Sequence, residues 1–125
     1  MTKRILIVDD EAGVREILQI CLEAVAGWEV FTAASGREGL AIAEAEQPDA
    51  ILLDVMMPGM DGPTTFRQLQ ANEAIRRIPT ILVTAKAGFS EQKQLLDLGV
   101  NGVVTKPFTP EYIVAKICKI LNWNL

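Results

Sequence analysis

A chain of 125 residues has room for one hydrophobic core, and a hydrophobic fraction of 50% excludes a disordered protein. The 16 acidic and 12 basic residues give a net charge of −4, with no basic stripe of the kind that binds nucleic acid directly. The absence of histidine excludes an imidazole base and an imidazole metal ligand, so any bound metal must be held by oxygen. We expect one domain over residues 1–125.

The first residues meet acidic positions after only four apolar ones, which is not the pattern of a signal peptide. No apolar run approaches the length of about 20 residues that a membrane-spanning helix needs. Cys21 and Cys118 lie far apart in apolar helical patterns, which favours small packing residues over a disulfide or a metal site. We therefore expect a cytoplasmic protein.

Short apolar runs alternate with longer amphipathic stretches along the chain. Most of the runs are continuously apolar, which is typical of parallel strands that are buried on both faces of a sheet. The predicted strands cover residues 5–8, 30–32, 50–53, 81–83 and 102–104.

The first two helices are predicted from apolar spacing and from capping residues. Gly27 is expected to end the first helix, and Ser35 with Glu38 forms a capping box for a helix over residues 36–46, which Pro48 terminates. The apolar positions expected to share one face of the first helix are Val14, Ile17, Leu18, Cys21, Leu22 and Val25.

The remaining helices are predicted from their first residues. Asp61 is expected to cap a third helix that reaches Leu69, with Pro63 tolerated in its first turn. Ser90 is expected to cap a fourth helix that ends near residue 99. Thr109 is expected to cap a fifth, which starts at Pro110 and runs to about residue 122.

The alternation predicts an α/β fold of the (βα)5 type, with a parallel sheet and right-handed crossovers. A closed barrel would need about twice this length, so a doubly wound open sheet is expected.

Polar residues follow four of the five predicted strands, at the edge where open α/β sheets bind their ligands. A single residue of this kind is most often a turn former or a helix cap, but here the residues are expected to converge. The second strand ends without such a residue and is expected to lie outside the site. The candidate site residues are Asp9, Asp10, Asp54, Thr84 and Lys106.

Three carboxylates at one edge repel each other strongly. A pair at about 4 Å costs roughly 4 kcal/mol at an effective dielectric near 20, which Lys106 alone does not offset. A hard divalent cation with oxygen ligands, Mg2+ rather than zinc, fits the charge. A carboxylate beside Mg2+ can attack phosphorus and form an acyl phosphate, with Lys106 and Thr84 positioned to bind the phosphoryl oxygens.

Four ordered motifs also resemble a known family. These are ILIVDDE, DVMMPGMDG with Asp54 at its start, ILVTA and TKPF. Over essentially its whole length the chain is similar to the CheY-like receiver domain of bacterial two-component response regulators. The resemblance implies a flavodoxin-like three-layer sandwich with strand order 2-1-3-4-5.

The resemblance also implies roles for these residues. Asp54 would be the phosphoacceptor, and Asp10, Asp54 and the backbone carbonyl of Met56 would hold Mg2+, with Asp9 acting largely through water. Thr84 would move toward the phosphoryl group, which Lys106 would contact. The bond between Lys106 and its following proline would be cis.

The implied partners are a sensor histidine kinase or phosphotransfer protein, which donates the phosphoryl group, and a downstream protein or output domain. The output surface would be formed by the fourth helix, the fifth strand and the fifth helix, in a monomer or weak dimer. Tyr112 and Trp123 are candidates to face a partner or to pack on their own domain. Val103 stands where the family often has Tyr or Phe, so transmission to this surface is expected to differ.

The chain would be a signalling switch, not an enzyme that acts on other molecules. It would not bind nucleic acid itself, although it could be the receiver part of a larger regulator such as a transcription factor. An aspartyl-nucleophile phosphatase would have a second Asp at position 56, where this chain has Met56. A flavodoxin-like flavin binder would have glycine- and hydroxyl-rich loops in place of paired carboxylates.

Overall fold

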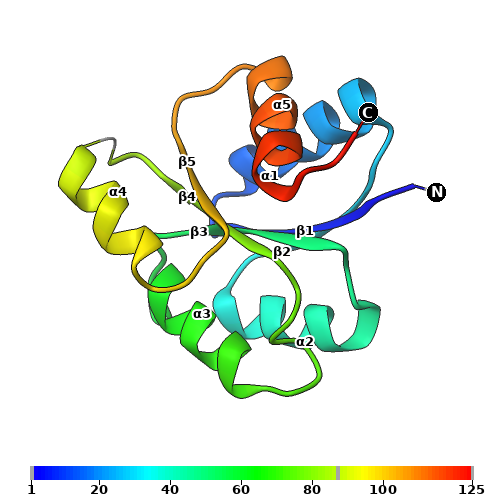
Figure 1. Cartoon of the computed structure of the whole chain (residues 1–125). Helices are drawn as coiled ribbons and strands as arrows, with labels where there is room; N and C mark the ends of the chain where they lie inside the picture. Colours follow the sequence, from blue (N-terminus) through cyan, green and yellow to red (C-terminus); the bar gives the residue numbers. More distant parts are fainter. Residues whose placement is uncertain (1, 87, 125) are drawn as a thin grey trace.

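Five parallel strands form one sheet at the centre of the molecule (Figure 1). The computed structural model describes residues 2–86 and 88–124. The strand order is β2-β1-β3-β4-β5, and every neighbouring pair is parallel, which confirms the predicted topology. The strands are β1 (Arg4–Val8), β2 (Glu29–Ala33), β3 (Ala50–Asp54), β4 (Thr80–Thr84) and β5 (Gly102–Thr105).

Helices cover both faces of this sheet. α1 and α5 lie on one side and α2 and α3 on the other, while α4 lies beside β5 at the edge of the sheet (Figure 1). This is the predicted three-layer (βα)5 arrangement. The helices are α1 (Ala12–Cys21), its π-helical continuation η1 (Leu22–Ala26), α2 (Gly36–Glu46), α3 (Gly62–Ala71), α4 (Phe89–Leu96) and α5 (Pro110–Leu121).

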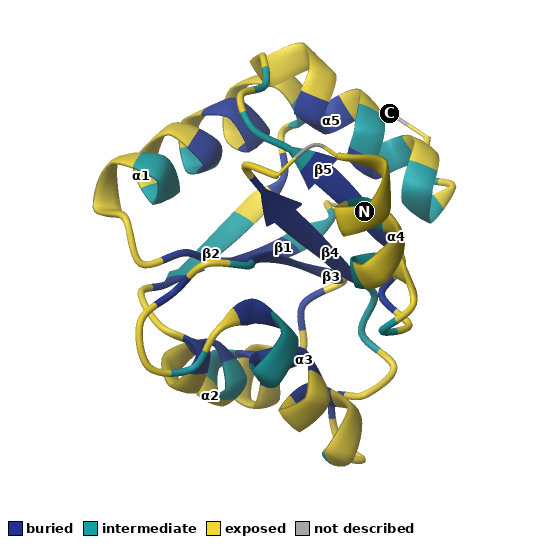
Figure 2. Ribbon diagram, turned by 90° about the vertical axis from the view of Figure 1, so that its left-hand side faces the viewer, coloured by how far each residue is buried: buried dark blue, intermediate teal, exposed yellow. Residues whose placement is uncertain are grey.

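The sheet has a hydrophobic cluster on each face, because successive side chains of a strand point to opposite sides. In β1, Ile5 and Ile7 belong to the cluster under α1 and α5, whereas Leu6 and Val8 belong to the cluster under α2 and α3. All five residues of β3 are buried. Figure 2 shows the buried strands in dark blue between helices whose outer faces are exposed. This double burial explains the continuously apolar runs.

The predicted start of α2 is confirmed in its main feature. The Ser35 hydroxyl accepts a hydrogen bond from the Glu38 amide at 3.2 Å, as an N-cap residue does. The Glu38 carboxylate reaches back to the amide of Ala34, at 3.4 Å, and not to that of Ser35. The reciprocal half of the capping box is therefore displaced by one residue.

The caps of α3 and α5 are confirmed. The Asp61 carboxylate accepts from the Thr64 amide at 2.8 Å, and the Thr109 hydroxyl accepts from the Tyr112 amide at 3.2 Å. A proline occupies the first turn of each helix, where the missing amide proton costs nothing. These two helices begin where the sequence predicts because the cap and the proline act together.

The predicted cap of α4 is wrong. The N-cap residue is Gly88, and Ser90 lies inside the first turn of the helix. Gly88 has the extended backbone of an N-cap residue, but it has no side chain that could accept a capping hydrogen bond and so mark the start of the helix in the sequence. The helix itself ends at Leu96, and the turn that follows closes at Gly99, where φ is +100°. Without a capping side chain, the boundary could not be located from residue types.

The first helix ends at Gly27 as predicted, with a left-handed φ of 71°. Its predicted apolar face is wrong at two positions, because Ile17 is 59% exposed and Val25 is 40% exposed. Val25 lies in η1, where the backbone has changed from α- to π-helical, so the α-helical spacing no longer describes which residues share a face.

Aromatic packing joins the two ends of the described chain. The Trp28 and Trp123 rings meet edge to face with centroids 5.5 Å apart, and the Lys3 ammonium lies 4.6 Å from the Trp123 ring centre. Trp123 thus packs on its own domain, whereas Tyr112 is 45% exposed.

Both cysteines are free thiols. Cys21 is buried and Cys118 is partly buried.

None of the helices in the described part of the chain has the length and apolar character needed to cross a membrane.

Gly62 is the glycine that places α3 against the end of β3. A Cβ at this position would lie 2.5 Å from the Asp54 carbonyl oxygen and 2.8 Å from the Val55 Cα, both of which are backbone atoms. We expect Gly62→Ala to lower the free energy of unfolding by about 1–3 kcal/mol, because α3 must move away from the strand. Urea unfolding followed by circular dichroism measures this effect.

Gly13 provides the matched control, since it also lies in the first turn of a helix. A Cβ there would meet nothing within 4 Å. Gly13→Ala should be neutral or stabilising by up to about 1 kcal/mol, through the higher helix propensity of alanine. Equal stability of the two variants would contradict the close contact at Gly62.

Candidate functional site

The strand register brings the predicted site residues to one edge of the sheet. β1 and β3 pair up to Val8 and Leu53, and β4 and β5 pair up to Thr84 and Thr105. The residues that continue these strands therefore emerge side by side. The residues at this edge are Asp9, Asp10, Asp54, Thr84 and Lys106. β2 is the outer strand next to β1 and contributes none of them.

Asp9, Asp10 and Asp54 form one carboxylate cluster. Each offers an oxygen that lies within 4.8 Å of the oxygens of the other two. Asp9 and Asp54 are buried, at 2% and 6% exposure, whereas Asp10 is exposed. The cluster thus has two members inside the protein and one at the water interface.

Hydrogen bonds hold Asp9 on several sides. Its amide donates to the Ala33 carbonyl at 3.1 Å, and its carboxylate accepts from the Glu11 amide at 2.9 Å. The Arg15 guanidinium donates to the Asp9 backbone carbonyl at 2.7 Å. Sequence reasoning missed Arg15, because nothing in its position on an amphipathic helix distinguishes it from an exposed arginine.

Lys106 bridges the two buried carboxylates. Its ammonium lies 3.2 Å from Asp54 Oδ1 and 3.4 Å from Asp9 Oδ2. Burial alone would lower the pKa of Lys106, but the charges of Asp54 and Asp9 outweigh this effect and raise it. The peptide bond between Lys106 and Pro107 is cis, as the resemblance implied.

The pKa of Asp54 is raised above its ordinary value. Burial is the largest cause, and the charge of Asp9 adds to it, while the Lys106 ammonium acts in the opposite direction. The ammonium therefore does not fully offset the cost of an ionised Asp54. The site retains unbalanced negative charge.

Thr84 is buried at the end of β4, with 1% exposure. Its hydroxyl oxygen accepts a hydrogen bond from the Lys86 amide at 3.1 Å. A hydroxyl that accepts a hydrogen bond still has its own proton to donate, so Thr84 remains able to bind an acceptor oxygen.

Met56 follows Asp54 by two residues, and it is 66% exposed.

The donor set fits a hard divalent cation. The three clustered groups are carboxylates, one of them is open to water, and the raised pKa of Asp54 shows that additional positive charge would stabilise its ionised form. Oxygen ligands combined with water molecules are what Mg2+ prefers in proteins, whereas zinc prefers nitrogen and sulfur.

The profile of the response regulator receiver domain matches residues 5–118. The chain belongs to this family. Among curated relatives, this receiver domain is 40% identical over 120 residues to the phosphate regulon transcriptional regulatory protein PhoB of Pseudomonas aeruginosa. That match covers 96% of this chain and 52% of PhoB, so the receiver domain spans about half the length of this relative.

Solved structures of receiver domains share the fold. The chemotaxis response regulator CheY4 of Vibrio cholerae superimposes with a TM-score of 0.89 at 30% identity, over 96% of this chain and 99% of CheY4. The receiver domain of the sensor histidine kinase PA1611 of Pseudomonas aeruginosa gives a TM-score of 0.85 at 29% identity, over 98% of this chain and 99% of that one. The PA1611 receiver was solved with a magnesium ion coordinated in its active site cleft.

The raised pKa of Asp54 predicts how pH affects stability without metal. Because the folded state binds this proton more tightly than the unfolded state, the contribution of Asp54 to stability falls as pH rises through its folded pKa. Asp54→Asn removes the charge, so at pH 7 with a chelator its thermal midpoint should exceed that of the wild type by a few degrees. The difference should shrink below about pH 4.

Asp97→Asn is the control for this measurement. Asp97 is exposed at the end of α4, far along the chain from the cluster, and its replacement should leave the midpoint unchanged at both pH values. An Asp54→Asn protein less stable than the wild type at pH 7 would show that the buried carboxylate is not under electrostatic strain.

Proposed function

We propose that this receiver domain is a Mg2+-dependent switch that accepts a phosphoryl group on Asp54 from a phosphohistidine of a sensor kinase or phosphotransfer protein. The observation that carries the proposal is a buried Asp54 carboxylate that shares one cluster with Asp9 and Asp10 and lies 3.2 Å from the Lys106 ammonium. Membership of the receiver family supports it.

The proposed metal ligands are the carboxylates of Asp10 and Asp54 and the backbone carbonyl of Met56, with Asp9 acting largely through water. Bound Mg2+ would neutralise charge that builds up on the phosphoryl oxygens. The magnesium ion in the active site cleft of the PA1611 receiver supports a metal at this site, and the clustering of the three carboxylates supports their part in binding it.

In the transfer step, an Asp54 carboxylate oxygen forms a bond to phosphorus while the phosphorus–nitrogen bond of the donor breaks. The histidine of the donor leaves with that electron pair, and Asp54 becomes an acyl phosphate. Lys106 already lies beside Asp54 Oδ1, so its ammonium can bind one phosphoryl oxygen. The Thr84 hydroxyl can donate its proton to another phosphoryl oxygen. The chain catalyses its own modification and acts on no other substrate.

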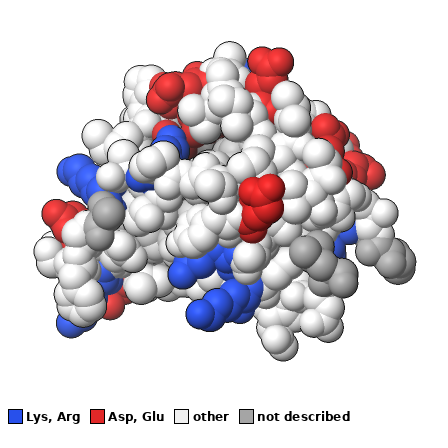
Figure 3. Space-filling view, turned by 90° about the horizontal axis from the view of Figure 1, so that it is seen from above, with Lys and Arg blue, Asp and Glu red and all other residues white. Residues whose placement is uncertain are grey.

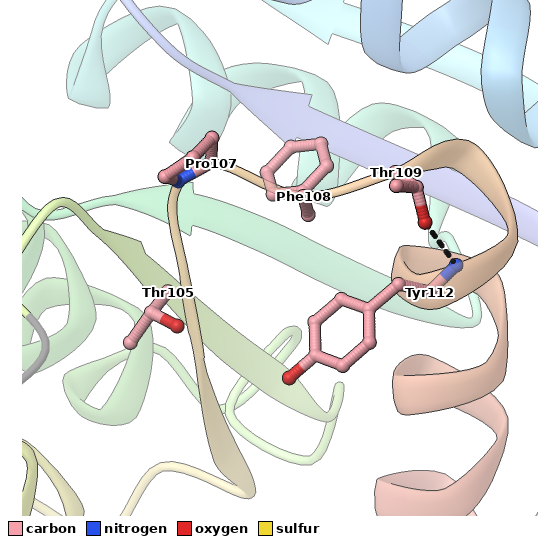
Figure 4. Close-up of a pocket in the computed structure, with 5 residues that line it drawn as sticks. All are labelled: Thr105, Pro107, Phe108, Thr109 and Tyr112. Atoms are coloured by element: carbon pink, nitrogen blue, oxygen red, sulfur yellow. Dashed lines mark hydrogen bonds between the residues drawn. The ribbon is translucent and has the colours of Figure 1, made fainter.

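The proposed output surface is formed by α4, β5 and α5. Figure 4 shows a hollow between the end of β5 and the start of α5, with the Tyr112 ring on one side and Thr105 on the other. Its volume is about 460 Å3.

Position 103 is occupied by a valine, which is buried at 7% exposure. A valine has no aromatic ring that could alternate between inward and outward positions. The change on phosphorylation must reach this surface through other side chains.

The partner at this surface would be a protein or an output domain. In the view of Figure 3, acidic and basic side chains of the described residues are interspersed, without a continuous basic surface for nucleic acid. We propose a cytoplasmic single domain, monomeric or weakly dimeric, that acts alone or as the receiver part of a longer regulator.

Phosphoryl uptake tests the central assignment. With a small phosphodonor and Mg2+, the wild-type protein should gain one acid-labile phosphoryl group by intact-protein mass spectrometry. Asp54→Asn should gain none, because the amide is not a nucleophile toward phosphorus. Asp97→Asn should match the wild type. Uptake by Asp54→Asn at the wild-type rate would refute the assignment.

Lys106→Ala separates metal binding from the response to phosphorylation. We expect this variant to bind Mg2+ at least as well as the wild type, because a competing cation is removed. Its amide resonances in β5 and α5 should respond weakly to beryllofluoride, a phosphoryl mimic, compared with the wild type. A full response at these resonances would remove Lys106 from the switch.

A further inference from the structure

The Asp9–Asp10 turn carries the exposed member of the carboxylate cluster. β1 ends at Val8. The Asp9 amide still bonds to the Ala33 carbonyl at the end of β2, but the Asp9 carbonyl lies beyond the strand pairing and takes a donor from another element. The Arg15 guanidinium, from the second turn of α1, donates to the Asp9 carbonyl at 2.7 Å, and Arg15 is itself partly buried. This is the shortest hydrogen bond to the turn, compared with 2.9 Å for the bond from the Glu11 amide to Asp9 Oδ1.

The Asp9 carbonyl belongs to the peptide unit that connects Asp9 to Asp10. Because a peptide unit is planar, the direction of its carbonyl also fixes the direction in which the chain reaches the Asp10 Cα. Lys106 holds the Asp9 carboxylate, and the bond from the Glu11 amide to that carboxylate closes a turn around this peptide unit, but neither bond reaches its carbonyl oxygen. Among the described residues, Arg15 supplies the side-chain donor to that oxygen, which adds a direct restraint on the orientation of the peptide unit and so on the starting point of the Asp10 side chain.

We infer that Arg15 is a positioning residue, which orients the Asp9–Asp10 peptide so that the Asp10 carboxylate is held ready to bind a divalent cation. This inference rests on the proposed function, since it concerns the same metal site. Residues that orient metal ligands from outside typically change metal affinity about 10- to 100-fold when they are replaced.

The charge of Arg15 alone would have the opposite effect. A guanidinium near the site repels a divalent cation, so a purely electrostatic role predicts tighter cation binding when Arg15 is replaced by a neutral residue. Orientation of the peptide predicts weaker binding. The sign of the change in affinity therefore distinguishes the two roles.

A purely structural role is tested with Arg4, at the other end of β1. Arg4 donates to the Glu46 carbonyl at 2.6 Å and forms ion pairs with the carboxylates of Glu46 and Glu29. It thus ties strand and helix together much as Arg15 does, but at the edge of the sheet opposite to the acidic cluster. Replacing Arg4 should affect stability and leave the metal site unchanged.

The test measures binding of Mn2+, as a paramagnetic probe, by electron paramagnetic resonance, together with the thermal midpoint of the metal-free protein. Arg15→Met keeps the apolar stem but removes the donor, and should weaken Mn2+ binding about 10-fold. Arg15→Lys keeps a donor and the charge and should restore part of the affinity. Arg4→Met should lower the thermal midpoint and bind Mn2+ as the wild type does.

Wild-type or tighter Mn2+ binding by Arg15→Met would overturn the inference, and so would an equal loss of affinity in Arg4→Met. If Arg15→Met does not fold, Arg15→Gln, whose neutral side chain is shorter than that of arginine, replaces it in the test: wild-type or tighter affinity overturns the inference and weaker affinity supports it. Asp10→Asn tests the proposed function separately. If that variant binds Mn2+ as the wild type does, Asp10 is not a ligand and the proposed metal site is wrong, whatever Arg15 does.

Discussion

Three carboxylates whose oxygens approach within 4.8 Å of one another meet at one edge of the sheet, and in the described part of the chain only Lys106 forms ion pairs with them. Two of the three are buried, so water cannot screen their repulsion well. Burial is the largest cause of the raised pKa of Asp54, and the charge of Asp9 adds to it. A cation at this edge would offset the repulsion.

The rest of the structure keeps this arrangement in place. β3 is buried along its whole length, and Asp54 at its end pairs with Val83 of β4. Gly62 lets the start of α3 approach the Asp54 carbonyl more closely than any other residue could. Asp9 is held through its amide, its carbonyl and its carboxylate. Preorganisation of this kind prevents the carboxylates from moving apart to reduce their repulsion.

Much of this could be predicted from the sequence, because the relevant signals are local or periodic. Continuously apolar runs identified the strands, the alternation with helices identified the layers, and residues directly after strands identified the site edge. Ser35, Asp61 and Thr109 cap their helices as expected, because each has a side chain that makes the capping bond. The cap of α4 was missed because Gly88 has no side chain to indicate it. Arg15 was missed because its bond to Asp9 depends on how a helix packs beside a strand end.

The pair of tryptophans has a spectroscopic consequence. Trp28 precedes β2 and Trp123 follows α5, so both indoles lie at the edge of the sheet from which the strands start, away from the acidic cluster. Their edge-to-face contact, with Lys3 over one ring, ties the end of the last helix to the core. Intrinsic fluorescence of this protein therefore reports how firmly that helix end is docked. A change in emission on phosphorylation would mean that the signal has crossed the full length of the sheet.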